Sequence, residues 1–223
     1  MSRTFGAEEL LFVVAAVRWT LLLSVVAITA GALVGFAIAL LRTMPNRFVR
    51  FAAAGYIQFF QGTPVLLQLF VFYYGAAAVL GLQIEAWPAV TLAFTLYSGA
   101  FLGEIWRGSI EAIPRTQWEA AACLSLTYSQ QLRYVILPQA MRIAIPPTVG
   151  FLVQLIKNTS IAAIIGFVEL TRAGQLMVNV TFQPMIVYPL VAALYFALCW
   201  PLSLASHFLE TRIDTRLGIA GRL

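Results

Sequence analysis

Polar and ionisable side chains inside long apolar runs are the residues of this sequence most able to do chemistry. Lys157, the only lysine, lies within "VQLIKNTSIAAI", and a charge at that depth in a bilayer is costly unless it faces protein or water. At 100° per residue, Gln154, Lys157 and Asn158 fall within one arc of a helix. This arc could line a pathway for a polar solute. Lys157 could equally extend to the membrane surface or pair with a carboxylate.

A second polar group lies in the apolar run 52–78. Gln61 and Gln68, seven residues apart, would share one face of a continuous helix, and Thr63 lies between them. Such side chains need water or partners at membrane depth, so we assign Gln61, Thr63 and Gln68 to a candidate substrate pathway. Pro64 removes a backbone donor and predicts a kink. Broken helices often mark the pathway of a transporter, although a kink can also serve packing alone.

Chemistry of other kinds has little support in the sequence. Glu104 and Arg107 stand three residues apart and predict a structural ion pair. Two cysteines and one histidine give no metal-binding spacing. The Gly-x-x-x-x-Gly-Lys-Ser/Thr loop that cradles nucleotide phosphates is absent, as are a serine elbow and paired catalytic carboxylates. We therefore expect a protein that is not an enzyme, binds no metal and holds no cofactor itself.

The elements that position these side chains follow from composition. Of the 223 residues, 61% are hydrophobic and only 10% charged, whereas a soluble domain is nearer 25% charged. About 20 mainly apolar residues cross the hydrocarbon core of a bilayer. The sequence thus predicts an all-α integral membrane protein, a single domain over 1–223, with an interfacial stretch at 10–17. Five segments qualify as spans: 19–41, 52–78, 87–106, 145–167 and 185–208.

The charge distribution predicts an orientation. Basic residues follow the first, third and fifth segments, and Lys and Arg favour the cytoplasmic side. Five crossings with the N-terminus outside and the C-terminus inside are expected. The net charge of +5 does not indicate nucleic-acid binding, because the basic residues are scattered at segment ends. The pairs Gly31–Gly35 and Gly99–Gly103 predict close approach of two helices.

The stretch 115–138 joins the third and fourth apolar segments and is too polar to cross a membrane. Its pattern predicts two short amphipathic helices, 117–124 and 129–136, with a bend between them and Pro138 ending the second. Such an elbow could lie flat on the membrane or fit into a groove of a partner protein. Periodicity alone leaves both open.

The residues of this elbow resemble a known motif. Glu119-Ala120-Ala121, a small residue six positions after the Glu, and Leu137-Pro138 resemble the EAA motif of ABC importer permeases. Four longer stretches, "QGTPVLLQLFVFYYG", "GEIWRGSIEAIPRTQWEAA", "LPQAMRIAIPP" and "LIKNTSIAAIIGFVELTRAGQ", resemble the polar amino acid uptake branch. The resemblance covers nearly the whole chain and implies the type I ABC importer transmembrane fold in the bacterial inner membrane.

The resemblance also implies roles for the elbow residues. In that family the elbow is a coupling helix that fits a groove of the cytoplasmic ATPase and moves with ATP binding and hydrolysis. The family usually has glycine at the bend, where this chain has Ser125, so the bend either avoids a positive φ or carries strain. The implied ATPase-coupling residues are Arg115, Trp118, Glu119, Ala120, Ala121, Ser125, Leu137 and Pro138.

The partners come from the resemblance as well. It implies a second permease, identical or paralogous, two cytoplasmic ATPases that bind ATP and Mg, and an extracytoplasmic substrate-binding protein that docks on outer loops near 83–85 and 169–175. The solute would be a polar amino acid or an analogue. Two other functions stay open from the residues alone: an ion-coupled secondary transporter that uses Lys157 and Glu104, and a membrane scaffold or sensor subunit that moves no solute.

Overall fold

The computed structural model describes residues 4–75, 78–79, 81 and 83–217. The regular elements in this part of the chain are helices. In chain order they are α1 (Ala7–Thr43), α2 (Arg47–Gly62), α3 (Val65–Phe70), the π-type turn η1 (Val71–Gly75), α5 (Ala86–Glu111), α6 (Arg115–Cys123), α7 (Tyr128–Gln130), the π-type turn η2 (Gln131–Ile136), α8 (Leu137–Asn158), the 3-10 helix η3 (Thr159–Ile165), α9 (Leu170–Thr181) and α10 (Pro184–Leu217).

Four helical stretches in the described residues are long and apolar enough to cross a membrane. They are Ala7–Thr43, Ala86–Glu111, Tyr128–Ile165 and Pro184–Ile213. The segment expected at 52–78 is instead divided, and its apolar part, Val65–Gly75, is shorter. The helix ends at Gly62 and resumes at Val65, after Pro64. The kink predicted at this proline is thus a complete break.

The first apolar segment is longer than predicted. The stretch 10–17, expected to lie apart at the membrane surface, belongs to α1, which runs unbroken for 37 residues. Arg18 does not interrupt the helix, because arginine is a good helix former. Its exposed guanidinium lies over the ring of Trp19, 5.4 Å from the centroid. A long side chain can in this way leave the apolar face of a helix intact.

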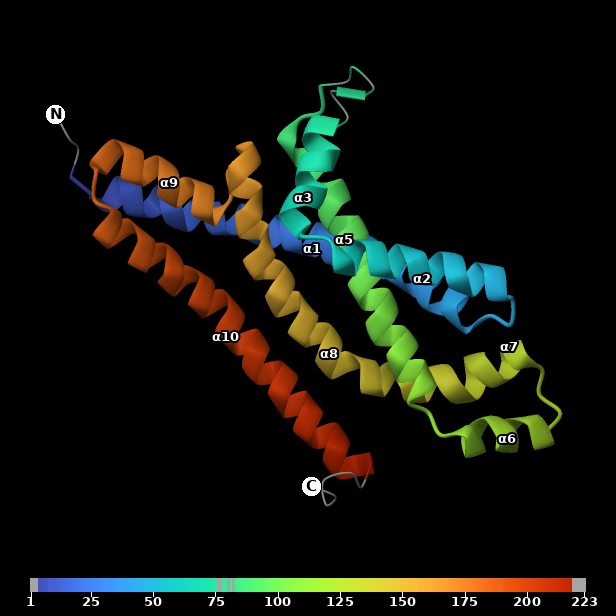
Figure 1. Cartoon of the computed structure of the whole chain (residues 1–223). Coiled ribbons are helices and arrows are strands. Elements are labelled where there is room, and N and C mark those ends of the chain that lie inside the picture. Colours follow the sequence, from blue (N-terminus) through green and yellow to red (C-terminus); the bar gives the residue numbers. More distant parts are fainter. Residues whose placement is uncertain (1–3, 76–77, 80, 82, 218–223) are drawn as a thin grey trace.

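The core forms where α1 crosses α5 (Figure 1). A Cβ at Gly31 would lie 2.5 Å from the Cβ of Ser98, and one at Gly35 would lie 2.9 Å from that of Leu102. Gly99 and Gly103 meet Val34 and Ile38 of α1 in the same way. The predicted close approach of two glycine pairs is confirmed. Buried residues of α3, α5 and α8, among them Leu69, Phe94 and Leu155, complete this core.

Two expectations about the connecting segments are wrong. Pro138 does not end a helix, because it lies in the first turn of α8, directly after η2. A π-type turn leaves a carbonyl without a helical donor, so the missing N–H of a proline is tolerated there. In addition, the segment after η3, expected as a loop at 169–175, forms α9, which packs against α1 and α10 (Figure 1).

Candidate functional site

The elbow, which we define as Arg115–Ile136, projects from one end of the helix bundle (Figure 1). Its first helix, α6, ends with two backbone hydrogen bonds, from Ser125 N to Ala122 O (2.9 Å) and from Leu126 N to Ala121 O (3.3 Å). This pair is the Schellman arrangement, whose first residue beyond the helix cap adopts a left-handed conformation. Ser125 does so, with φ 59°. Of the two possibilities for Ser125, the structure has the positive φ.

The inner face of the elbow is apolar and fixed to the bundle. Ile113, after α5, and Ile136, at the end of η2, are buried together. Trp118 of α6 and Leu132 of η2 pack against this cluster, as does Leu137 at the start of α8. The predicted apolar faces of the two short helices therefore turn towards each other and towards α5 and α8.

The outer face of the elbow carries the residues that remain for a partner. Arg115, Glu119 and Ala120 are exposed, whereas Ala121 is buried. The Glu and the first Ala of the motif thus point away from the bundle, and the second Ala points into it. This arrangement presents one positive charge, one negative charge and a small side chain on a surface whose inner side packs against α5 and α8.

The predicted pathway residues of the second segment separate at the helix break. Gln68 is buried, and its Nε2 donates to Phe60 O (2.8 Å), Thr63 O (3.0 Å) and Thr63 Oγ1 (2.9 Å). Gln61 is exposed. The expectation that Gln61 and Gln68 share one face is wrong, because it assumed a continuous helix. Gln68 stabilises the break by donating to Phe60 O, the carbonyl that the missing N–H of Pro64 leaves without a helical donor.

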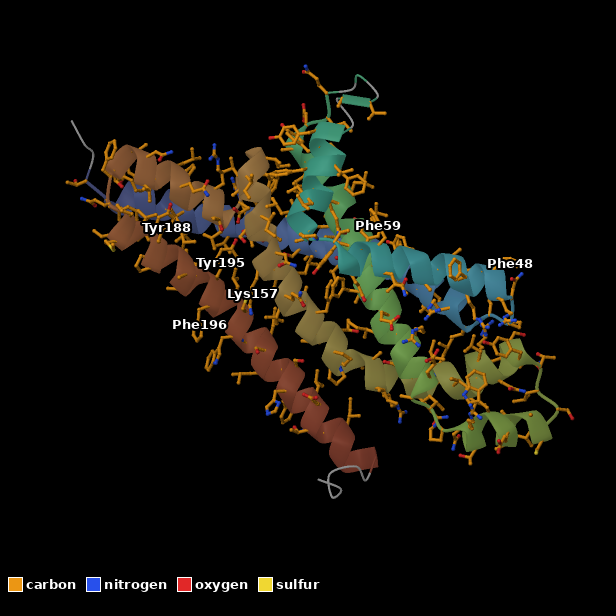
Figure 2. The ribbon with its side chains drawn as sticks, in the orientation of Figure 1. Phe48, Phe59, Lys157, Tyr188, Tyr195 and Phe196 are labelled. Atoms are coloured by element: carbon orange, nitrogen blue, oxygen red, sulfur yellow. The ribbon has the colours of Figure 1, made fainter. Side chains whose placement is uncertain are left out.

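The polar arc of α8 does form. Gln154 Nε2 and Asn158 Nδ2 both donate to the hydroxyl of Tyr97 on α5, at 3.4 and 3.2 Å. Lys157 is exposed, and Figure 2 shows it on the part of α8 that lies beside α10. The arc therefore has two amides tied to one tyrosine and a cation next to them. No hydrogen bond in the described residues joins Gln61 or Thr63 to this arc.

Arg107 forms ion pairs with both Glu104 and Glu111. Its Nε lies 2.8 Å from Glu104 Oε2, so the contact with Glu104 is bidentate. Glu111, one turn further along α5, was not singled out in the sequence, although its i, i+4 spacing from Arg107 is a standard helix pairing. The three residues together hold the end of α5 from which the elbow continues.

Sequence reasoning missed a buried carboxylate. Glu169 is completely buried and caps α9: its carboxylate accepts from Thr171 N (2.9 Å) and Arg172 N (2.8 Å), and from Tyr195 Oη of α10 (2.6 Å). Burial raises the pKa of Glu169, and these hydrogen bonds oppose the rise. Glu169 cannot itself touch a docked protein. Asp, Asn, Ser and Thr are the usual capping residues, so the sequence held no clear signal.

A bundle of long apolar helices with an elbow fixed at one end is the architecture of a membrane transport subunit. The chain belongs to the family described as binding-protein-dependent transport system inner membrane component, whose model matches residues 11–219. It is therefore a multi-pass permease subunit of an importer that depends on a binding protein. This confirms the family resemblance drawn from the elbow motif.

Individual relatives agree. The chain is 37% identical over 205 residues to the probable amino-acid ABC transporter permease protein YckA of Bacillus subtilis (strain 168), covering 92% of this chain and 90% of that one. It is 35% identical over 199 residues to the L-cystine transport system permease protein TcyB of the same organism, covering 89% and 85%.

Solved structures share the fold. The crystal structure of an amino acid ABC transporter with histidines has a chain 31% identical to this one, with a TM-score of 0.86 over 94% of this chain and 100% of that one. An inward-facing MetNI methionine ABC transporter has a chain with a TM-score of 0.77 at 18% identity, over 93% and 99%. The expected type I importer permease fold is confirmed.

Proposed function

We propose that this permease forms the membrane pathway for uptake of a polar amino acid or an amino-acid-like solute. It works with a second permease, identical or paralogous, two cytoplasmic ATPases that bind ATP and Mg, and an extracytoplasmic binding protein. The observation that carries the proposal is the elbow: Glu119 and Ala120 are exposed on a surface whose inner side is packed against α5 and α8. A surface of this kind can transmit a push from a partner to the membrane helices.

The proposed topology has five crossings of the bacterial inner membrane, with the N-terminus outside. Four crossings are the long apolar stretches, and α2 with α3 supplies the remaining one as a broken helix. This arrangement puts the elbow and the basic segment ends in the cytoplasm, in keeping with the preference of Lys and Arg for that side. The break at Pro64 is tolerated where it is buried in protein or lines a cavity.

The pathway lies along the polar face of α8. Lys157 supplies a cation for the carboxylate of the solute, and Gln154 and Asn158 supply amides beside it, positioned by the Tyr97 hydroxyl. Gln61 and Thr63, at the end of α2, complete the pathway from a second helix, and Gln68 supports the break from behind. Amino-acid solutes are proposed because the relatives are named for amino acids and L-cystine.

The test is ATPase activity of the complex purified with the neighbouring gene products and reconstituted in liposomes. Loaded binding protein should stimulate the native complex, and Glu119→Arg should abolish stimulation or assembly without preventing membrane insertion. Thr116→Arg is the matched control, because Thr116 is exposed on the same helix outside the motif. Uptake by the permease alone, without any ATPase, would overturn the proposal.

A further inference from the structure

Two contacts between the elbow and the membrane helices lie far enough apart to act separately. The first is the apolar cluster of Ile113, Ile136 and Trp118 against α5 and α8. These two helices directly precede and follow the elbow in the sequence. The second is a hydrogen bond across 85 residues of sequence: the hydroxyl of Tyr128 donates to the backbone carbonyl of Thr43, at 2.8 Å. Thr43 is the last residue of α1, and α1 is not continuous with the elbow.

The ring of Tyr128 is held in place by its surroundings. Tyr128 is the first residue of α7, whose start is fixed by a hydrogen bond from Thr127 N to Gln130 Oε1 (2.9 Å). The ring stacks on Trp118 of α6, with centroids 5.9 Å apart and planes at 17°. Both halves of the elbow therefore determine where the hydroxyl points, and any movement of the elbow displaces it.

Thr43, which accepts this hydrogen bond, lies at a corner between α1 and α2 that further hydrogen bonds stabilise. The last carbonyls of a helix have no helical donor, so Thr43 O is available to an outside hydroxyl. Asn46 caps α2 three residues later by accepting from Phe48 N, at 2.9 Å. Arg42 Nη1 donates back across the corner to Arg50 O, at 3.4 Å. The corner between α1 and α2 is thus one unit, and a displacement of Thr43 moves both helices.

At its other end α1 reaches α9 and α10 (Figure 1). Thr20 Oγ1 accepts from Leu170 N at 3.1 Å, beside the buried Glu169, and Val13 packs with Leu170 and Val187. Gln183 Oε1, just before α10, accepts from Phe5 N at 3.2 Å. One helix therefore connects the elbow to the opposite end of the bundle, where α9 lies.

From these contacts we propose that Tyr128 is a positioning residue for coupling: its hydroxyl links movement of the elbow to α1, and through α1 to α9 and α10. This route works beside the direct route through α5 and α8. The inference rests on the proposed function, in which the elbow receives the motion of the ATPase. It adds that the motion reaches the bundle at two points and that one of them depends on a single hydrogen bond.

The experiment uses Tyr128→Phe in the complete complex, reconstituted in liposomes with loaded binding protein. Phenylalanine keeps the ring that stacks on Trp118 and removes only the hydroxyl. A hydrogen bond is worth about 1 kcal/mol net, so we expect the amount of solute imported per ATP hydrolysed to fall about fivefold. Assembly, basal ATPase activity and the concentration of binding protein that gives half-maximal stimulation should stay at their native values, which a general structural defect would not allow.

Tyr134→Phe is the matched control. Tyr134 is an exposed tyrosine of the same elbow, with the Arg133 guanidinium 5.6 Å from its ring centroid, and its variant should import as the native protein does. A native ratio in Tyr128→Phe, an equal loss in Tyr134→Phe, or failure of Tyr128→Phe to assemble would each overturn the inference. Glu119→Arg distinguishes failure of this inference from failure of the proposed function. If Glu119→Arg leaves stimulation by the binding protein intact, the proposed function fails as well.

Discussion

The Schellman ending of α6 places Ser125 in a strained backbone conformation. Ser125 occupies the left-handed region, with φ 59°, where a side chain costs about 1–2 kcal/mol. Glycine at this position would remove the strain. Part of the gain would be offset, because glycine gives the unfolded chain more conformational freedom to lose on folding. We expect Ser125→Gly to stabilise the elbow by about 0.5–1 kcal/mol, and amide hydrogen exchange at residues 125 and 126 to slow about two- to fivefold.

The control for Ser125→Gly is Leu124→Gly. Leu124 precedes the bend with φ −82°, a conformation that any residue adopts, so glycine there relieves nothing and should speed exchange. Slower exchange in both variants would indicate that strain at Ser125 is not the cause.

Glu169 gives the stability of the protein a pH dependence whose sign follows from burial. Its pKa lies above the ordinary value of 4.5, mainly through burial. A carboxyl with a raised folded pKa stabilises the fold most below 4.5, and this contribution falls as pH rises from 4.5 through the folded pKa. Glu169→Gln is neutral throughout, so its melting temperature minus that of the native protein should rise over this window.

The measurement is thermal unfolding in detergent from pH 4 to pH 8. Glu85→Gln is the control for removing a carboxylate, because Glu85 is exposed and lacks the burial to which the slope at Glu169 is assigned. A flat difference for Glu169→Gln would contradict the assignment of the slope to this carboxyl.

Some residue roles are set by neighbours in the sequence and could be predicted, whereas others are set by contacts with distant helices and could not. The spacing of Glu104 and Arg107 suffices to predict an ion pair. The elbow motif alone does not separate the exposed Glu119 from the buried Ala121. The burial of Glu169 and the hydrogen bond of Tyr128 depend on contacts with α10 and α1, far away in the sequence. No local pattern carries such contacts, so the sequence alone could not have predicted these two residues.

At the scale of elements, packing of α1 on α5 is the feature most sensitive to small changes. A Cβ at Gly31 would lie 2.5 Å from Ser98 Cβ and 3.1 Å from Thr95 O. Overpacking of this kind costs about 1–3 kcal/mol, and each kcal/mol lowers the melting temperature of a protein this size by about 2–4 °C. We expect Gly31→Ala to melt several degrees below the native protein in detergent.

Gly55→Ala is the control for this packing. A Cβ at Gly55 meets nothing within 4 Å, and alanine favours a helix over glycine. Its melting temperature should equal or exceed the native value. A loss in both variants would point to glycine flexibility in the helices, not to the contact between α1 and α5.

Element boundaries were predictable where one local force dominates. Long apolar runs located α1, α5 and α10, and Pro64 located the break. The outer ends were not fixed in this way, because α1 begins at Ala7 and α10 ends at Leu217, well beyond the predicted 19–41 and 185–208. The continuation through Pro138 was not predictable, because it depends on a π-type turn directly before it. The helix α9 was missed because its twelve residues are too short and too polar to span, and it is held by burial against α1 and α10.

At the scale of the whole molecule, the native cysteines offer a direct test of the proposed topology. Cys123 is exposed at the end of α6, and Cys199 is buried in α10. Because the elbow is proposed to lie in the cytoplasm, a membrane-impermeant maleimide should label Cys123 in inside-out vesicles and leave it unlabelled in right-side-out ones. Cys199→Ala removes the second thiol, so that any label reports on the elbow alone.

The same thiol also reports on docking. If the elbow sits in a groove of the ATPase, labelling of Cys123 in inside-out vesicles should slow when the ATPase is bound and recover when it is stripped away. Labelling from the outer side would reverse the orientation and separate the elbow from any cytoplasmic partner. If Cys123 is labelled in inside-out vesicles at the same rate with and without the ATPase, the proposed topology stands. The surface that contacts the ATPase then lies away from the end of α6. These outcomes differ because the elbow is fixed to α5 and α8 by its inner face, so only its outer face can be covered by a partner.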